Sequence, residues 1–263
     1  MKRLVSLLAL VLMSNAALAA VVSKEVEYKA GDTPLKGYIA WDDAIKGKRP
    51  AVLVVHEWWG LNDYARMRAR MLAEMGYTAM AVDMYGNGKQ ATHPDDAGKF
   101  ASEARKSLPV AEARFKAAMK LLQQEKSVDP KHIAAIGYCF GGGIVLEMLR
   151  RGVKLDGVAS FHGTLPGQTV AKPGTIKTKV LVLNGADDPF TTKEQIDAFK
   201  KEMETARIDY RFISYPGAKH GFTNPDATKY GTEFNMPLAY NAEADTLSWQ
   251  ELDLFLKEIF KKK

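Results

Sequence analysis

One cysteine stands in a glycine-rich turn between an apolar strand pattern and a helical pattern. The turn reads Gly137-Tyr138-Cys139-Phe140-Gly141-Gly142 and directly follows an apolar run that ends at Ile136. A nucleophile in such a turn needs small residues two positions before and after it, because larger side chains would clash. The N-terminus of the following helix supplies free N–H groups and a dipole that stabilise a thiolate. The pattern predicts that Cys139 is a nucleophile; the alternative is a buried structural cysteine.

A carboxylate and a histidine follow two later strand patterns. Asp187 and Asp188 lie in the turn Asn184-Gly185-Ala186-Asp187-Asp188-Pro189, where a carboxylate can orient a histidine or simply cap a turn. Asp188 is our first choice and Asp187 the second. His220 lies in a loop after the last strand pattern. The order nucleophile, acid, histidine is the chain order of α/β-hydrolase triads, so we predict that Cys139, Asp188 and His220 meet. The competing histidines are His56, His93, His132 and His162.

A loop after the first buried strand pattern has the position of an oxyanion loop. It reads His56-Glu57-Trp58-Trp59-Gly60. In hydrolases of this architecture, the oxyanion is held by a backbone N–H from this loop and by that of the residue after the nucleophile. We therefore predict that the backbone N–H groups of Trp58 and Phe140 form the oxyanion hole. The two tryptophans either belong to the core or line an apolar substrate pocket.

These residues sit on alternating strand and helix patterns. Residues 26–40 read as an antiparallel hairpin around Gly31-Asp32-Thr33-Pro34. The predicted strands are residues 51–55, 78–82, 133–136, 157–159, 180–183 and 210–214. The predicted helices are residues 63–75, 110–124, 142–151, 192–206 and 244–260. The pattern predicts a mostly parallel sheet with helices on both faces, and ligand chemistry at the carboxyl ends of its strands.

Local signals support some of the helix ends. Thr191 and Glu194 have the spacing of a capping box at the start of the fourth predicted helix. Gly76 and Gly152 suit the left-handed position after a helix. The segment 223–242 is longer than a usual loop, which indicates an active-site cover or short helices.

The first 19 residues resemble a secretory signal peptide. Lys2 and Arg3 precede an apolar run, and Ala17-Leu18-Ala19 is a small-x-small cleavage site, so we expect cleavage after Ala19 and a periplasmic or secreted protein. A membrane anchor is the alternative, but the apolar run is shorter than the roughly 20 residues that span a bilayer. No later stretch is long enough either, and we expect no stable membrane insertion after signal removal.

Composition is that of one globular domain with a mild positive charge. The chain has 263 residues, 46% hydrophobic and 26% charged, and no linker divides it. The formal charge of +6 becomes +4 once the two cations of the signal are removed. The basic residues of segments 65–74 and 112–126 are interleaved with other types, so we expect them on solvated helix faces and expect no nucleic-acid partner. A single cysteine excludes an intramolecular disulfide.

Together these motifs resemble the dienelactone hydrolase family over nearly the whole chain after residue 19. The resemblance rests on Gly137–Gly142, the Glu57 loop, the Asp188 turn and His220-Gly221-Phe222. It implies an α/β-hydrolase fold and a carboxymethylenebutenolidase-like hydrolase that cleaves an ester or lactone through a cysteine thioester. It also implies that Glu57 contacts the resting cysteine and regulates its thiol.

One departure from the family concerns the substrate. Family members that take dienelactone hold its carboxylate with arginines, and the matching positions here are Asn87 and Asn224. An amide cannot reproduce that charge-assisted clamp, although Lys89 or Lys219 could compensate. The candidates for lining the substrate pocket are Trp59, Tyr85, Asn87, His162, Phe222 and Asn224.

The expected reaction needs no metal or organic cofactor. Its substrate is a small-molecule ester or lactone, and we expect the protein to be a monomer. Two other functions are considered. A non-catalytic periplasmic ligand-binding protein could use the same fold with an idle triad. A thiol redox protein is the weaker rival, since the sequence has no C-x-x-C pair and no resolving cysteine.

Overall fold

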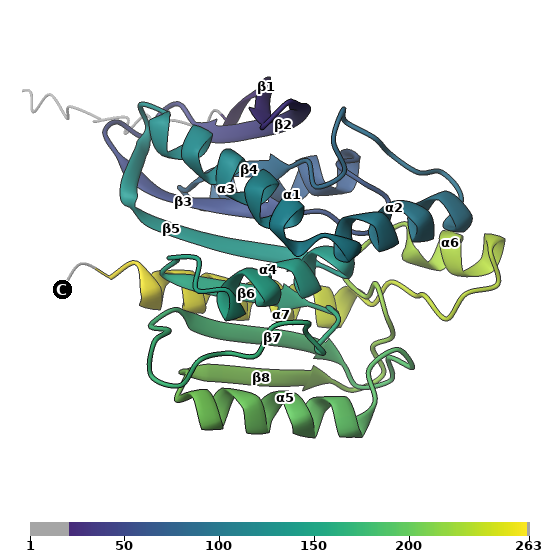
Figure 1. Cartoon of the computed structure of the whole chain (residues 1–263). Coiled ribbons are helices and arrows are strands. Elements are labelled where there is room, and N and C mark those ends of the chain that lie inside the picture. The colour runs from purple at the N-terminus through teal and green to yellow at the C-terminus, as the bar shows by residue number, and fades with distance from the viewer. Residues whose placement is uncertain (1–20, 262–263) are drawn as a thin grey trace, which may run out of the picture.

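An eight-stranded sheet forms the centre of the protein. The computed structural model describes residues 21–261 (Figure 1), and the predicted signal peptide, residues 1–19, lies outside the described residues. The strands are β1 (Val21–Ala30), β2 (Thr33–Asp42), β3 (Arg49–Val55), β4 (Thr78–Val82), β5 (Val128–Tyr138), β6 (Gly157–Phe161), β7 (Lys179–Gly185) and β8 (Tyr210–Tyr215). Their order is β1-β2-β4-β3-β5-β6-β7-β8. β2 is antiparallel to both β1 and β4, and every other pairing is parallel.

Helices cover both faces of this sheet. They are α1 (Asp63–Glu74), α2 (Pro94–Lys106), α3 (Leu108–Gln124), α4 (Phe140–Arg150), α5 (Lys193–Ala206), α6 (Ala227–Glu233) and α7 (Ala242–Ile259). On one face, α3, α4 and α5 bury residues such as Phe115, Leu149 and Phe199; on the other, α1 and α7 bury Leu72 and Leu252. Within residues 21–261, no helix combines the length and the apolar character needed to cross a membrane.

The predicted sheet is confirmed, with a tighter entry hairpin than expected. Ala30 pairs directly with Thr33, so only Gly31 and Asp32 form the turn, and Thr33 already belongs to β2. Gly31 has a φ of 57°, a left-handed conformation that glycine adopts without a steric penalty. The parallel strands end at one edge of the sheet, where α6 also lies (Figure 1). That edge carries the side chains described below.

Two helices and one cap differ from the sequence prediction. The capping box of α5 is formed by Thr192 and Gln195, one residue later than the predicted pair Thr191 and Glu194. Both pairs have the required spacing, so the pattern alone does not select one. Helix α2 was not predicted, whereas α6 lies in segment 223–242, where short helices were one of the two interpretations but no bounds were given. The buried residues of α2 are all alanines, which give only a weak apolar period, and α6 has seven residues.

Candidate active site

Cys139 occupies a sharp turn between β5 and α4. Its φ of 52° and ψ of −114° lie in a strained region for a residue with a side chain. The turn depends on glycine: a Cβ at Gly137 would lie 2.1 Å from the Gly141 carbonyl oxygen, and one at Gly141 would lie 2.3 Å from the Val55 carbonyl oxygen. The Cys139 N–H donates to the Phe161 carbonyl of β6 at 3.0 Å. The turn therefore holds the thiol at the N-terminus of α4 by backbone geometry.

His220 and Asp188 form a pair in which Asp188 is buried and His220 is partly exposed. His220 Nδ1 and Asp188 Oδ2 are 2.8 Å apart, and the Asp188 side chain has no exposed surface. The other oxygen of Asp188 accepts the Phe190 N–H at 2.9 Å, which fixes the carboxylate. Asp187, in contrast, is exposed and bonds Ala218 only through its backbone N–H. Asp188, and not Asp187, is therefore the carboxylate that pairs with His220.

The electrostatics of His220 connect it to Cys139. Burial works to lower the pKa of the imidazole, but the charge of Cys139 and the hydrogen bond and charge of Asp188 raise it to about 10. The imidazole of His220 therefore favours its protonated form. His220 is thus paired with Asp188, and the charge of Cys139 acts on its pKa, although the three residues come from separate loops.

His56 and Tyr85 shape the loop after β3. The ring of His56 bonds the Glu57 carbonyl through Nδ1 and accepts the Met84 N–H through Nε2 at 3.3 Å. The Tyr85 hydroxyl donates to the Trp58 carbonyl at 2.9 Å. These hydrogen bonds connect the loop to the segment after β4. His56, one of the competing histidines, is buried and bonds the backbone of the loop.

The two backbone donors of the predicted oxyanion hole are available. Among hydrogen bonds between residues 21–261, neither the Trp58 N–H nor the Phe140 N–H has a partner. The Phe140 amide is the first of α4, where the N–H groups of a helix have no acceptor within the helix. Both donors adjoin residues already placed at the site, Glu57 and Cys139.

Glu57 is buried and hydrogen-bonded to an amide. Its carboxylate accepts from Asn224 Nδ2 at 2.6 Å, whereas the family resemblance pointed to a contact with Cys139. Burial raises the pKa of Glu57 to about 7, against the opposing effects of the Asn224 hydrogen bond and the charges of His220 and Arg68. The carboxyl group therefore titrates near neutral pH.

Comparisons with known proteins agree with this geometry. The model of the dienelactone hydrolase family matches residues 35–260, which is most of the chain. The chain belongs to the dienelactone hydrolase family. It is 29% identical to "Protein usf" of Aquifex pyrophilus over 204 residues, which are 76% of this chain and 86% of that protein.

Two solved structures are similar over the whole fold of this dienelactone hydrolase family member. One is a dienelactone hydrolase-like promiscuous phosphotriesterase from metagenomic libraries, with 35% identity, a TM-score of 0.86, and coverage of 92% of this chain and 100% of that one. The other, titled m3DLH, has 36% identity, a TM-score of 0.87 and the same coverage. The family and these structures establish an α/β-hydrolase fold and place the chain among hydrolases.

Some pocket candidates of this dienelactone hydrolase family chain lie deep in the fold. His162 is fully buried at a φ of 38°, and its Nε2 is 2.8 Å from Thr223 Oγ1. Its ring packs edge-on against those of His220 and Phe222, at 5.2 and 5.3 Å between centroids. Phe222 is itself fully buried. These residues pack behind the catalytic histidine candidate.

Of the other candidates, Trp59 in the loop after β3 is buried and Asn87 after β4 is exposed. Trp59 is buried beneath α6, with its ring 4.8 Å from Tyr230 and 6.2 Å from Phe234 between centroids. The segment 223–242 therefore includes a helix that covers Trp59. Asn87 is exposed at a φ of 57°, and its backbone N–H donates to the Pro34 carbonyl of β2.

Two residues near the site were not singled out from the sequence. Phe190 is 51% exposed and meets the His220 ring edge-on at 5.1 Å between centroids. Its position two residues after Asp188 is the signal that could have found it. Arg68 is 1% exposed, although the basic residues of segment 65–74 were expected on a solvated face. An arginine on the apolar side of a helical pattern is the signal that the sequence offered there.

Proposed function

We propose that the protein hydrolyses carboxylic esters or lactones with Cys139 as nucleophile, His220 as base and Asp188 as the residue that orients the base. The single observation that carries this proposal is the pair of His220 and Asp188, 2.8 Å apart, whose imidazole is affected by the charge of Cys139, a residue in a strained turn at a helix N-terminus. That arrangement has the nucleophile, base and orienting acid that covalent acyl transfer requires.

The proposed reaction has two halves. In the first, the Cys139 sulfur, its proton held by His220, bonds to the substrate carbonyl carbon, and the C–O bond of the ester breaks. The leaving alkoxide takes the proton from His220, which leaves a thioester on Cys139. In the second, His220 removes a proton from water, and the hydroxide attacks the thioester. The acid leaves and the sulfur recovers the proton from His220.

The oxyanion formed in each half needs donors that are already in place. The free N–H groups of Trp58 and Phe140 suit this role. Removal of one such donor typically lowers kcat by about 10²- to 10³-fold. Tyr85 supports the first donor through the Trp58 carbonyl.

The substrate we propose lacks a carboxylate that must be clamped. The Asn224 amide is committed to Glu57, and Asn87 is an exposed loop residue. Phe190, half exposed against His220, offers an apolar contact at the rim instead. Neutral small aryl esters and lactones are therefore the first substrates to assay.

The test compares wild type with Cys139→Ala on those esters and lactones. We expect the variant to lose hydrolysis, and intact-mass analysis of the wild type to show an acyl adduct on its only thiol. Equal activity in both proteins would eliminate Cys139 as nucleophile. Tight binding of esters without turnover or adduct would favour the non-catalytic ligand-binding function.

We also propose that the protein is exported and is a monomer. The features of residues 1–19 favour a mature protein that starts at Ala20 in the periplasm or outside the cell. N-terminal sequencing of the protein recovered from the periplasmic fraction tests the cleavage site, and light scattering tests the monomer.

A further inference from the structure

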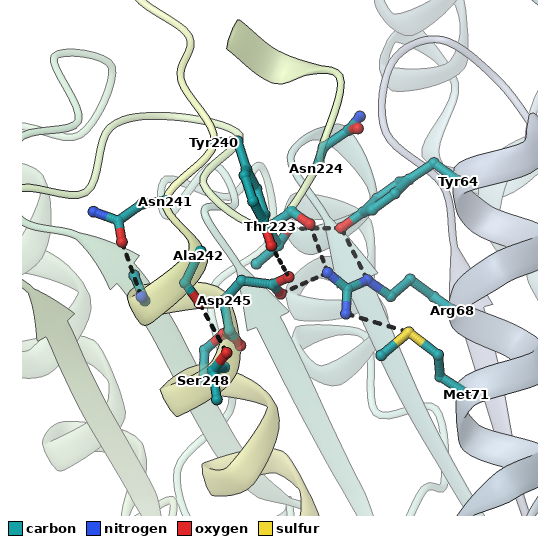
Figure 2. Close-up of polar contacts among 12 residues, drawn as sticks. Tyr64, Arg68, Met71, Thr223, Asn224, Tyr240, Asn241, Ala242, Asp245 and Ser248 are labelled. Carbon is teal, nitrogen blue, oxygen red and sulfur yellow. Dashed lines mark hydrogen bonds and ion pairs between the residues drawn. The ribbon is translucent and has the colours of Figure 1, made fainter.

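Arg68 is a charged residue buried at the junction of three elements. It comes from α1 and is 1% exposed. Its Nη2 donates to the Thr223 carbonyl and to Asp245 Oδ1 of α7, both at 2.6 Å, and its Nε donates to the Tyr64 hydroxyl at 3.3 Å. Figure 2 shows the guanidinium between these groups. Aromatic rings surround it as well, with Tyr138 and Trp249 centroids at 5.5 and 5.1 Å.

Burial of this cation needs compensation, and the geometry supplies it. A lone buried charge would cost several kcal/mol, and the hydrogen-bonded Asp245 carboxylate offsets much of that cost. The rigid fork of an arginine can reach a carbonyl, a carboxylate and a hydroxyl together, which a lysine cannot do. The residue is therefore matched to three specific acceptors on three elements.

Thr223 is the point at which Arg68 reaches the site. It lies in the histidine loop, which we define as residues 220–224. Its backbone carbonyl accepts from Arg68, and its Oγ1 lies 2.6 Å from the Tyr64 hydroxyl and 2.8 Å from His162 Nε2. The next residue, Asn224, holds Glu57.

The hydrogen bond between Thr223 and His162 extends this set of contacts to His220. The His162 ring packs edge-on against His220 at 5.2 Å between centroids, so the chain of hydrogen bonds from Arg68 ends on a ring that supports the base. The positive charge of Arg68 also favours the neutral form of His162, whose pKa lies well below its usual range, chiefly because the ring is buried. Arg68 thus bonds the histidine loop directly at the Thr223 carbonyl, and through the Tyr64 hydroxyl and Thr223 Oγ1 it is connected to the ring that packs against His220.

We propose that Arg68 is a positioning residue for the hydrolase site, which it serves by fixing the histidine loop through Thr223. This inference rests on the proposed function, because it assigns Arg68 to the placement of the proposed base. Arg68 touches neither Cys139 nor His220 directly. Its effect is on how well His220 reaches the sulfur.

Arg150 provides a matched control. It is also a buried arginine, 4% exposed, and it bonds Glu202 and the Leu165 carbonyl. It lies at the far end of α4 from Cys139. Loss of either arginine removes a buried ion pair and a carbonyl contact, so both should lower the melting temperature. Only Arg68 connects to the histidine loop.

The experiment follows alkylation of Cys139 by iodoacetamide from pH 5 to pH 9, together with kcat and KM for an aryl ester. The chain has no other thiol, so the signal comes from Cys139 alone. In Arg68→Met we expect alkylation at pH 6 to fall about 10-fold and kcat to fall about 10- to 100-fold, with KM within about 3-fold, as for a misplaced catalytic group. Arg68→Lys keeps the charge without the fork, so it should recover only part of the loss. Arg150→Met should keep the wild-type alkylation profile.

Several results would overturn the inference. It fails if folded Arg68→Met retains the wild-type alkylation profile and kcat, or if Arg150→Met shifts the profile equally. If Arg68→Met does not fold, Arg68→Lys takes its place, because lysine cannot bond the Thr223 carbonyl, the Tyr64 hydroxyl and Asp245 together; a wild-type alkylation profile and kcat in that variant also overturn the inference. The proposed function can fail separately: a wild type without esterase activity, whose alkylation profile still depends on Arg68, would retain the positioning role and lose the proposed reaction.

Discussion

The buried carboxyl group of Glu57 gives a prediction with a magnitude. Its pKa is raised from the ordinary 4.5 to about 7, mainly by burial, so between these values the folded chain keeps a proton that the unfolded chain has lost. The contribution of Glu57 to the free energy of unfolding must therefore fall as the pH rises through this range. At about 1.4 kcal/mol for each factor of ten, the fall attributable to Glu57 is about 3 kcal/mol between pH 4.5 and pH 8.

Glu57→Gln isolates this contribution. Glutamine has nearly the same shape, stays neutral at every pH and can still accept from the Asn224 amide. The other titrating groups are common to both proteins. We expect the unfolding free energy of the variant, relative to the wild type, to increase by about 3 kcal/mol from pH 4.5 to pH 8. Urea unfolding followed by tryptophan fluorescence measures it at each pH. A constant difference between the two proteins across this range would refute the assignment of a neutral buried carboxyl group.

Two further pairs of variants test the triad and the elbow. Asp188→Asn should lower kcat about 10²- to 10⁴-fold because the histidine loses its orienting carboxylate. The kcat of Asp187→Asn, a change at an exposed residue, should remain within about 2-fold of the wild type. Steady-state kinetics measures both variants, and equal effects would contradict the assignment of Asp188. Gly141→Ala should cost about 3 kcal/mol or more in thermal unfolding because its Cβ would lie 2.3 Å from the Val55 carbonyl oxygen; Gly98→Ala in α2, where a Cβ meets nothing within 4 Å, should gain about 0.5 to 1 kcal/mol.

The parallel strands and the residues that follow them could be predicted because each signal is local. A run such as residues 51–55 is apolar throughout since both faces of the sheet are covered, and no distant information is needed to recognise it. The same holds for the elbow around Cys139, whose glycines are required by contacts within the turn and with β3. Since the carboxyl ends of parallel strands share an edge, placing each reactive residue after a strand already indicated that they would lie near one another.

What the sequence could not provide depends on contacts between distant segments. The Asn224 amide meets Glu57 across 167 positions, and Arg68 meets Thr223 across 155 and Asp245 across 177. An arginine within an amphipathic segment is usually solvated. Here the acceptors on Thr223 and Asp245 offset the cost of burying the Arg68 charge. Local pattern also missed α2, whose inward face consists of alanines.

Asn224 connects the departure from the family to the chemistry of the site. An arginine at this position would place a full positive charge against Glu57 and hold the carboxyl group ionised. The amide donates one hydrogen bond at 2.6 Å but brings no charge, so it only partly offsets burial and the pKa of Glu57 remains at about 7. The carboxyl group then changes charge near neutral pH, and its charge interacts with that of His220. Asparagine at position 224 therefore lacks the charge that a carboxylate clamp requires, and it leaves the charge of Glu57 dependent on pH near neutrality.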